Sequence, residues 1–198
     1  MDAVALLLGQ HARLHSATVA ESEAGSLEDD LLGGIADAEL RVGSLPGHNP
    51  PVWVWWHIAR TEDVLMNSVV IDGEQVFDRD RWAGSLSVER RDIGTGMDAA
   101  AVEQLATAVD IPALRAYRSA VGSRTREIVS GFGAEDLDRS IDGRGAARAR
   151  EAGAFGPGAE WVDAAWQGTT LGFLLGRNLL VHNALHVGEA IVVGPRSI

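Results

Sequence analysis

The sequence predicts an all-α protein, a four-helix bundle with long connections. Four segments carry apolar residues at helical spacing, and few segments alternate in the way that strands do. The last of the four is apolar nearly all the way round, which is typical of a helix buried inside a bundle. With 198 residues, 46% of them hydrophobic, the chain is long enough to bury a full core. We therefore expect a single domain over residues 1–198.

The first helix is predicted over roughly Ala3 to Ala20. Its apolar and histidine positions follow the period of a helix, at Val4, Leu7, Leu8, His11, Leu14 and His15. A stretch with Gly and acidic residues comes next, in which a short helical piece is possible around residues 27–35.

The second helix has a clear start signal. Asn49 can cap it, and Pro50 and Pro51 suit the first turn, where a missing amide proton costs nothing. The helix should continue to about Ile71, where Asp72 and Gly73 end it. Residues 73–97 then have the composition of an extended connection.

The third helical segment is expected from Asp98, with a restart at Asp110-Ile111-Pro112 and an end at Gly131. The following part of the chain, from Ala134 to Gly168, predicts a Gly-rich loop at about 140–168, with a short strand possible at its edges. Seven Gly and Pro residues indicate this: Gly143, Gly145, Gly153, Gly156, Pro157, Gly158 and Gly168.

The fourth helix is predicted from about Thr170 to Val193, before Gly194-Pro195. It carries His182 and His186 four residues apart, which places both imidazoles on one face, about one turn from each other. Two such histidines can clamp one ion, although they can also be core residues satisfied by hydrogen bonds. Spacing alone leaves both interpretations open.

His57 favours the metal interpretation, because it lies in the middle of the second helix and a bundle can bring it to the His182–His186 pair. Three histidines with open coordination positions are typical of a catalytic rather than a structural site. The sequence therefore predicts one divalent metal ion on His57, His182 and His186. Zinc, nickel, iron and manganese would all tolerate these ligands, and zinc or nickel is our first expectation.

The remaining histidines have weaker signals. His11 and His15 form a second pair four residues apart, but their helix is near a terminus and less apolar, so ordinary structural residues are favoured over ligands. His48, in the turn before the second helix, is expected to be a solvated loop residue.

Other residues around these histidines have two interpretations each. Trp53 and Trp56 flank His57 and could form a pocket wall, although core packing is the commoner use of tryptophan. Glu189 could orient a ligand ring or be a plain exposed acid near the helix end. Arg60, Glu62 and Asp63 are interpreted as the solvated side of the second helix.

Composition excludes several classes of chemistry. All 17 basic residues are Arg, so mechanisms that need a lysine amine are excluded. Cysteine is absent, which removes disulfides, protein thiolates and Cys-ligated zinc. The net charge of −11 opposes nucleic-acid binding. The longest apolar stretch is interrupted by charged residues, so we expect no membrane span and a cytoplasmic protein.

Two segments with these histidines resemble a known family. The run from Asn49 to Asp63, NPPVWVWWHIARTED, is similar to the second helix of the DinB-like superfamily, and is closest to its actinobacterial branch with mycothiol-dependent enzymes. The run from His182 to Ala190, HNALHVGEA, resembles the metal motif of that family's last helix, and residues 131–139 are similar to its turn after the third helix. The resemblance spans most of the chain, but only the two histidine segments are specific.

This resemblance implies a four-helix bundle, often dimeric, with a metal on the residues matching His57, His182 and His186. It also implies a metal-dependent enzyme that transfers or isomerises with a low-molecular-weight thiol of the mycothiol type and a small electrophilic substrate. A non-catalytic metal-binding or small-ligand-binding dimeric bundle is the alternative. An apolar-ligand carrier without metal is a third hypothesis, which requires the three histidines to be ordinary core residues.

Overall fold

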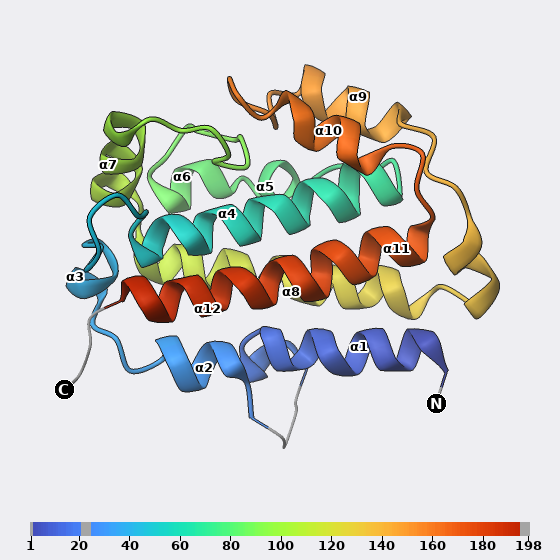
Figure 1. Ribbon diagram of the computed structural model, residues 1–198, viewed down its shortest axis with the longest axis horizontal. Helices are drawn as coiled ribbons and strands as arrows, with labels where there is room; N and C mark the ends of the chain where they lie inside the picture. Colours follow the sequence, from blue (N-terminus) through green and yellow to red (C-terminus); the bar gives the residue numbers. More distant parts are fainter. Residues whose placement is uncertain (1, 21–24, 195–198) are drawn as a thin grey trace.

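The computed structural model describes residues 2–20 and 25–194, and they form a helical bundle without a strand in those ranges. Its long members are α1 (Ala3–Leu14), α4 (Pro51–Asp63), α8 (Ile111–Ser130) and the last helix of the chain. Figure 1 shows these helices side by side, with α1 on one side of the bundle and the helices of the 140–168 segment on the other. The predicted all-α class is confirmed.

The last helix is built from three consecutive pieces. These are α11 (Leu171–Leu175), the π-helical segment η4 (Gly176–His182) and α12 (Asn183–Val193), and the chain leaves the helix at Gly194. Thr170 caps the start, where its side chain accepts a hydrogen bond from the Phe173 amide. π-Helical turns inside longer helices are frequent at functional sites, and this one ends at His182.

The second long helix starts at Pro51, close to the predicted start, but the predicted Asn49 cap is not formed, because Pro50 is the capping residue and no side chain caps the helix. Pro51 occupies the first turn of α4, which continues as a second π-helical segment, η2 (Val64–Val70). Every residue of α4 is buried. The helix therefore lies in the centre of the molecule rather than on its surface.

The first helix is shorter than its predicted span of residues 3–20. It ends at Leu14, and a short 3₁₀ turn, η1 (Ala17–Val19), follows. His15 and Ser16 have extended backbone angles that break the helix. The Ser16 side chain then caps η1 by accepting a hydrogen bond from the Thr18 amide. Beyond it lie α2 (Leu27–Leu32) and α3 (Asp37–Leu40).

The predicted break in the third segment is confirmed. Helix α7 (Ala99–Ala108) is capped by the Asp98 side chain, and α8 is capped by Asp110 with proline in its first turn. The connection before it, which we expected to be extended, contains two short helices, α5 (Val76–Arg79) and α6 (Trp82–Leu86).

The expectation of a loop at 140–168 needs correction. This part contains α9 (Arg144–Glu151) and α10 (Glu160–Trp166), preceded by the 3₁₀ turn η3 (Ala134–Asp138). The Gly and Pro residues that predicted a loop lie mainly between the helices, while the Ala- and Arg-rich sequence within α9 favours a helix. Arg150 and Asp163 form an ion pair between α9 and α10. The possible short strand is reduced to one antiparallel bridge between Ser140 and Thr170.

The bundle has two apolar clusters along its length. The first surrounds the N-terminal half of α4, with Trp55, Trp56 and Ile58 among its members. The second surrounds η2 and α11, and includes Trp166 of α10. The three predicted ligand histidines lie on α4, η4 and α12, the helices that these clusters hold against one another. None of the described helices is both long and apolar enough to cross a membrane.

Candidate metal centre

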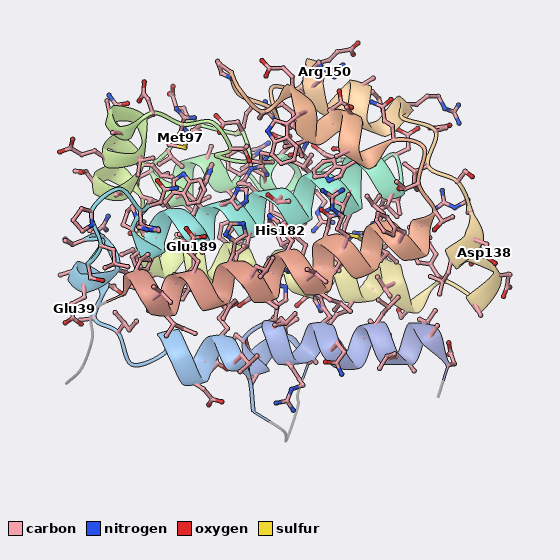
Figure 2. The ribbon with its side chains drawn as sticks, in the orientation of Figure 1. Glu39, Met97, Asp138, Arg150, His182 and Glu189 are labelled. Carbon is pink, nitrogen blue, oxygen red and sulfur yellow. The ribbon has the colours of Figure 1, made fainter. Side chains whose placement is uncertain are left out.

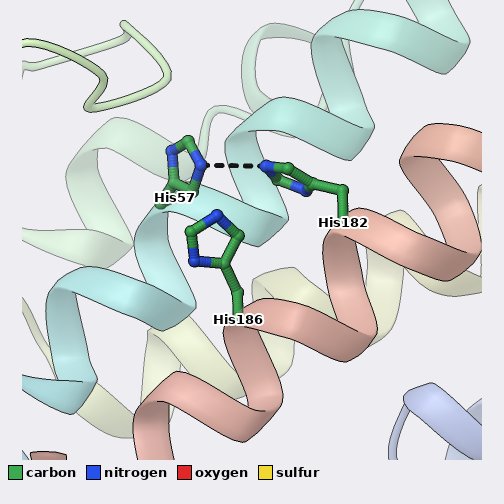
Figure 3. A group of neighbouring side chains, drawn as sticks. All are labelled: His57, His182 and His186. Atoms are coloured by element: carbon green, nitrogen blue, oxygen red, sulfur yellow. Dashed lines mark hydrogen bonds between the residues drawn. The ribbon is translucent and has the colours of Figure 1, made fainter.

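The structure brings His57, His182 and His186 together. His57 comes from the middle of α4, His182 is the last residue of η4, and His186 lies one turn later on α12. Their rings converge in the space between the two helices, as Figure 3 shows. The three ring centroids lie 4.5–5.0 Å apart, and one ligand atom from each residue lies within 4.8 Å of the other two. Such a group could hold a metal ion.

The proton of His57 is fixed by its surroundings. Its Nδ1 lies 2.6 Å from the backbone carbonyl oxygen of Ile93, which can only accept. Nδ1 must therefore carry the proton, and Nε2 keeps its lone pair. Burial, and next the nearby His186, lower the pKa of His57 to about 4, so the ring is neutral at neutral pH.

His186 is oriented in the same way by a carboxylate. Its Nδ1 lies 2.6 Å from Oε2 of Glu189, and the hydrogen bond from His186 lowers the pKa of Glu189. The carboxylate is thus an acceptor, Nδ1 of His186 is the donor, and Nε2 is free to bind. Of the two interpretations of Glu189, ring orientation agrees with the structure, and Figure 2 shows its place on the side of α12 that faces α4.

His182 completes the group. Its Nε2 lies 3.0 Å from Nε2 of His57, the contact drawn in Figure 3. Burial, followed by the neighbouring His57, lowers the pKa of His182 to about 3. The three imidazoles thus converge through ring nitrogens, and two of them have Nδ1 held by an acceptor. Metal-ligating histidines require this geometry. The residues present therefore fit a divalent metal.

The histidines border a cavity of about 350 Å³. The indole of Trp53 stacks on the His57 ring, with 4.9 Å between centroids and an angle of 6° between planes. Ile93 and Met97 come from the connection before α7, and α10 contributes the other wall with Val162 and Trp166. The 140–168 segment therefore closes one side of the site. Trp53 forms the pocket wall considered for it, whereas Trp56 is a core residue whose Nε1 donates to the Asp92 carbonyl at 3.1 Å.

Two polar side chains of the cavity were not predicted as site residues from the sequence. Thr61 lies one turn after His57 on α4, is 3% exposed, and its hydroxyl has no hydrogen-bond partner within the described residues. Asn178 lies one turn before His182, and its Oδ1 accepts a hydrogen bond from Nε1 of Trp166 at 3.2 Å. The spacing of four from a predicted ligand could have indicated both residues.

A second group of potential ligands lies deeper in the bundle. Nε2 of His11 and Nε2 of His15 each lie 2.9 Å from a different carboxylate oxygen of Glu62. All three side chains are buried, and they too could hold a metal ion. The expectation that His11 and His15 are ordinary structural residues therefore has a competing interpretation, whereas His48 is exposed as expected.

The carboxylate of Glu62 in this second group is already satisfied by donors from the protein. Glu62 Oε2 also accepts a hydrogen bond from Asn183 at 2.9 Å and lies 3.7 Å from a guanidinium nitrogen of Arg118. Although burial opposes this, the partners His15 and His11 hold the pKa of Glu62 well below its ordinary value. Because the carboxylate has protein donors on both oxygens, we interpret the group as a hydrogen-bonded network that attaches α1 to α4.

Arg60, Glu62 and Asp63 are not solvated, and that expectation was wrong. All three are at most 2% exposed. Arg60 donates to Asp63 Oδ2 at 3.0 Å and to the Tyr117 hydroxyl at 2.8 Å, while Asp63 accepts from the amides of Val76 and Phe77. Charged side chains can be buried in this way because each finds partners on neighbouring segments. The apolar period of a helix says nothing about such partners.

The fold and the site define a helical bundle with a candidate histidine metal centre. The family model described as the DinB superfamily matches residues 22–190, so the chain belongs to this superfamily, whose members often bind metal. A solved structure, titled the crystal structure of the conserved protein of locus from Enterococcus faecalis, is similar with a TM-score of 0.64 and 17% identity. The match covers 96% of this chain and 94% of that chain, and at this identity it shows the fold alone. No curated protein matches the chain.

Proposed function

We propose that the protein is a metal-dependent S-transferase or isomerase that joins a low-molecular-weight thiol of the mycothiol type to a small electrophile. The observation that carries this proposal is the fixed orientation of His57 and His186. With Nδ1 of each ring held by the Ile93 carbonyl or by Glu189, both Nε2 atoms face a cavity large enough for a small substrate. A purely structural site would not need that cavity.

A divalent metal on these three histidines would supply Lewis acidity, which lowers the pKa of a thiol so that thiolate exists at neutral pH. The chain has no cysteine, so any thiol must come from a substrate. Zinc and nickel suit three imidazoles with open positions.

The other residues of the cavity have roles that follow from their position. Trp53 holds the His57 ring flat and excludes water on one side, and Ile93 and Val162 supply apolar surface for the electrophile. The unpartnered Thr61 hydroxyl can donate a hydrogen bond to a bound substrate, because the described part of the chain offers it no other partner.

The metal is tested first. Untagged wild-type protein should contain one equivalent of zinc or nickel at this centre, and His57→Ala and His186→Ala should lose it. His48→Ala is the matched control, because this histidine is exposed in a turn outside the centre, and it should keep the metal. A metal-free wild type whose stability is unchanged by added Zn²⁺ or Ni²⁺ would contradict the proposal.

The reaction is tested with several thiols and 1-chloro-2,4-dinitrobenzene. The loaded wild type should form the thioether with release of chloride faster than the His57→Ala variant, for at least one thiol. Rates equal to those of the variant for every thiol would count against transfer and favour a bundle whose metal is structural or serves ligand binding alone.

A further inference from the structure

The cavity at the three histidines differs in charge from the protein as a whole. The chain has a net charge of −11, yet no carboxylate side chain lines the cavity among the described residues. One guanidinium, that of Arg177, does line it. A cavity lined by one cationic side chain and no acidic side chain, in an otherwise acidic protein, favours an anionic ligand.

Arg177 is available for such a ligand. It lies on η4, one residue before Asn178 and five before His182, and its side chain is exposed at the cavity. Its polar contact within residues 2–20 and 25–194 is a hydrogen bond from one guanidinium nitrogen to the carbonyl oxygen of Ala165, at 3.5 Å. This is at the outer limit of hydrogen-bond length, so the remaining donors of the planar fork are free.

An exposed tryptophan also lines the cavity. Trp161 of α10 lines the same cavity and is 60% exposed, although its side chain is one of the largest apolar groups of the chain. Val162 and Trp53 add apolar lining to the same cavity, and Trp53 stacks on the His57 ring. An exposed indole and a guanidinium that line the same cavity can together recognise a planar apolar body with a charged end.

We propose that Arg177 binds the carboxylate of an electrophilic substrate whose flat apolar body lies along Trp161. A carboxylate is the anion that this argument favours, because the planar guanidinium of Arg177 matches its two oxygens and no other arginine lines the cavity among the described residues. The identity of the ligand as the electrophile rests on the proposed function. The anion site is independent of that function, because it is tested by binding measurements without thiol transfer.

The test uses zinc-loaded full-length protein and two isosteric probes, 4-chlorobenzoate and 4-chlorobenzamide, titrated by calorimetry. Wild type should bind the carboxylate at least about tenfold more tightly than the amide, as expected for hydrogen bonds to a charged group. Arg177→Gln should remove this preference, and Arg177→Lys should keep part of it. Arg13→Gln is the matched control for net charge, because Arg13 is exposed on α1.

Each other outcome decides the proposal as well. A preference that persists in Arg177→Gln shows that the carboxylate is bound elsewhere, for example by the metal, and overturns the proposal. Trp161→Ala should weaken both probes equally, and no effect on either would overturn the role of the indole. A second pair of probes, the thiol 3-mercaptopropionate and its amide, tests whether the anion belongs to the thiol instead. If Arg177→Gln removes the preference for the carboxylate only in this thiol pair, the anion belongs to the thiol and the proposal fails.

The two proposals fail separately. An Arg177-dependent preference in a protein without thiol transfer would refute the reaction and support the anion site. Thiol transfer without any preference for the carboxylate would support the reaction and refute the anion site.

Discussion

Glu189 fixes the orientation of the His186 ring through one hydrogen bond of 2.6 Å to Nδ1. His57 has its equivalent partner in a backbone carbonyl, which no substitution of a side chain can remove. Of these two orienting groups, only Glu189 can be tested by mutation. A substitution of Glu189 leaves the proposed ligand atoms of the histidines unchanged.

We expect Glu189→Gln to lower the affinity for Zn²⁺ by roughly 10- to 100-fold, because the amide is a weaker acceptor and reduces the basicity of the ring. The measurement is competition with a chromophoric chelator. Glu103→Gln, which removes an exposed acid from α7, should leave the affinity unchanged. Equal affinities in all three proteins would show that Glu189 does not act on the metal.

His15 makes the stability of the protein depend on pH. Burial, and then the nearby Arg118, lower the pKa of His15 from 6.5 to about 3 in the folded state. The unfolded chain therefore binds a proton below pH 6.5 that the folded protein resists, and stability falls as pH decreases from 6.5 towards 3. Glu62 acts in the same direction, since its lowered pKa contributes stability above about pH 4.5 that is lost as the pH falls through the folded pKa.

The other ionisable side chains of this network are His11 and the pair Glu28 and Arg118, whose hydrogen bond is 2.5 Å long. Burial raises the pKa of Glu28, which opposes the effect of His15, so a variant is needed to separate them. Between pH 6.5 and 4.5, the free energy of unfolding should fall less steeply with decreasing pH in His15→Gln than in wild type. The difference in slope should be up to about 1.4 kcal/mol per pH unit, the value for one proton. Urea unfolding at several pH values measures this, and parallel curves would contradict it.

At the scale of elements, α9 packs against η2 through a glycine. A Cβ at Gly145 would lie 2.6 Å from Cα of Val69 and would also meet the backbone carbonyl of Ser68. Backbone atoms inside a packed helix cannot move aside as a flexible side chain can. The close approach of α9 to the central helix therefore depends on the absence of a side chain at this position.

Gly145→Ala should destabilise the protein by about 1–3 kcal/mol through overpacking. Gly188→Ala is the matched control, because a Cβ there meets nothing within 4 Å and the residue lies inside α12. That control should be neutral or stabilising by about 0.5–1 kcal/mol. Denaturant unfolding compares the two, and a Gly145→Ala variant as stable as wild type would refute the packing argument.

The long elements could be predicted because their signals are local. Pro51, the Asp98 and Asp110 caps and Gly194 each mark a helix end through the chemistry of a few neighbouring residues. The helices of 140–168 were missed because glycines between short helices look the same in sequence as glycines of a loop. Their stability comes from contacts with η2 and from the Arg150–Asp163 pair, which are distant in sequence.

At the scale of the whole molecule, the candidate centre could be predicted only in part. The spacing of His182 and His186 and the family resemblance of His57 pointed to the three residues, and the structure brings them together. The Ile93 carbonyl and Arg177 could not be found, because their position depends on how distant segments fold over the site. The burial of Glu62 was missed for the same reason, since its partners come from three other helices.

A metal shared by α4 and α12 should stabilise the entire bundle, because both helices are central to its core. Free Zn²⁺ at 100 times its dissociation constant would add about 2.7 kcal/mol to the folded state, provided that the unfolded chain binds it weakly. For a chain of this length, that corresponds to a rise in Tm of roughly 5–10 °C. Differential scanning calorimetry of chelator-treated protein, with and without Zn²⁺, should show this rise in wild type and in His48→Ala, but not in His57→Ala. An equal rise in His57→Ala would mean that zinc stabilises the protein elsewhere, and the buried group of His11, His15 and Glu62 would then be the place to look.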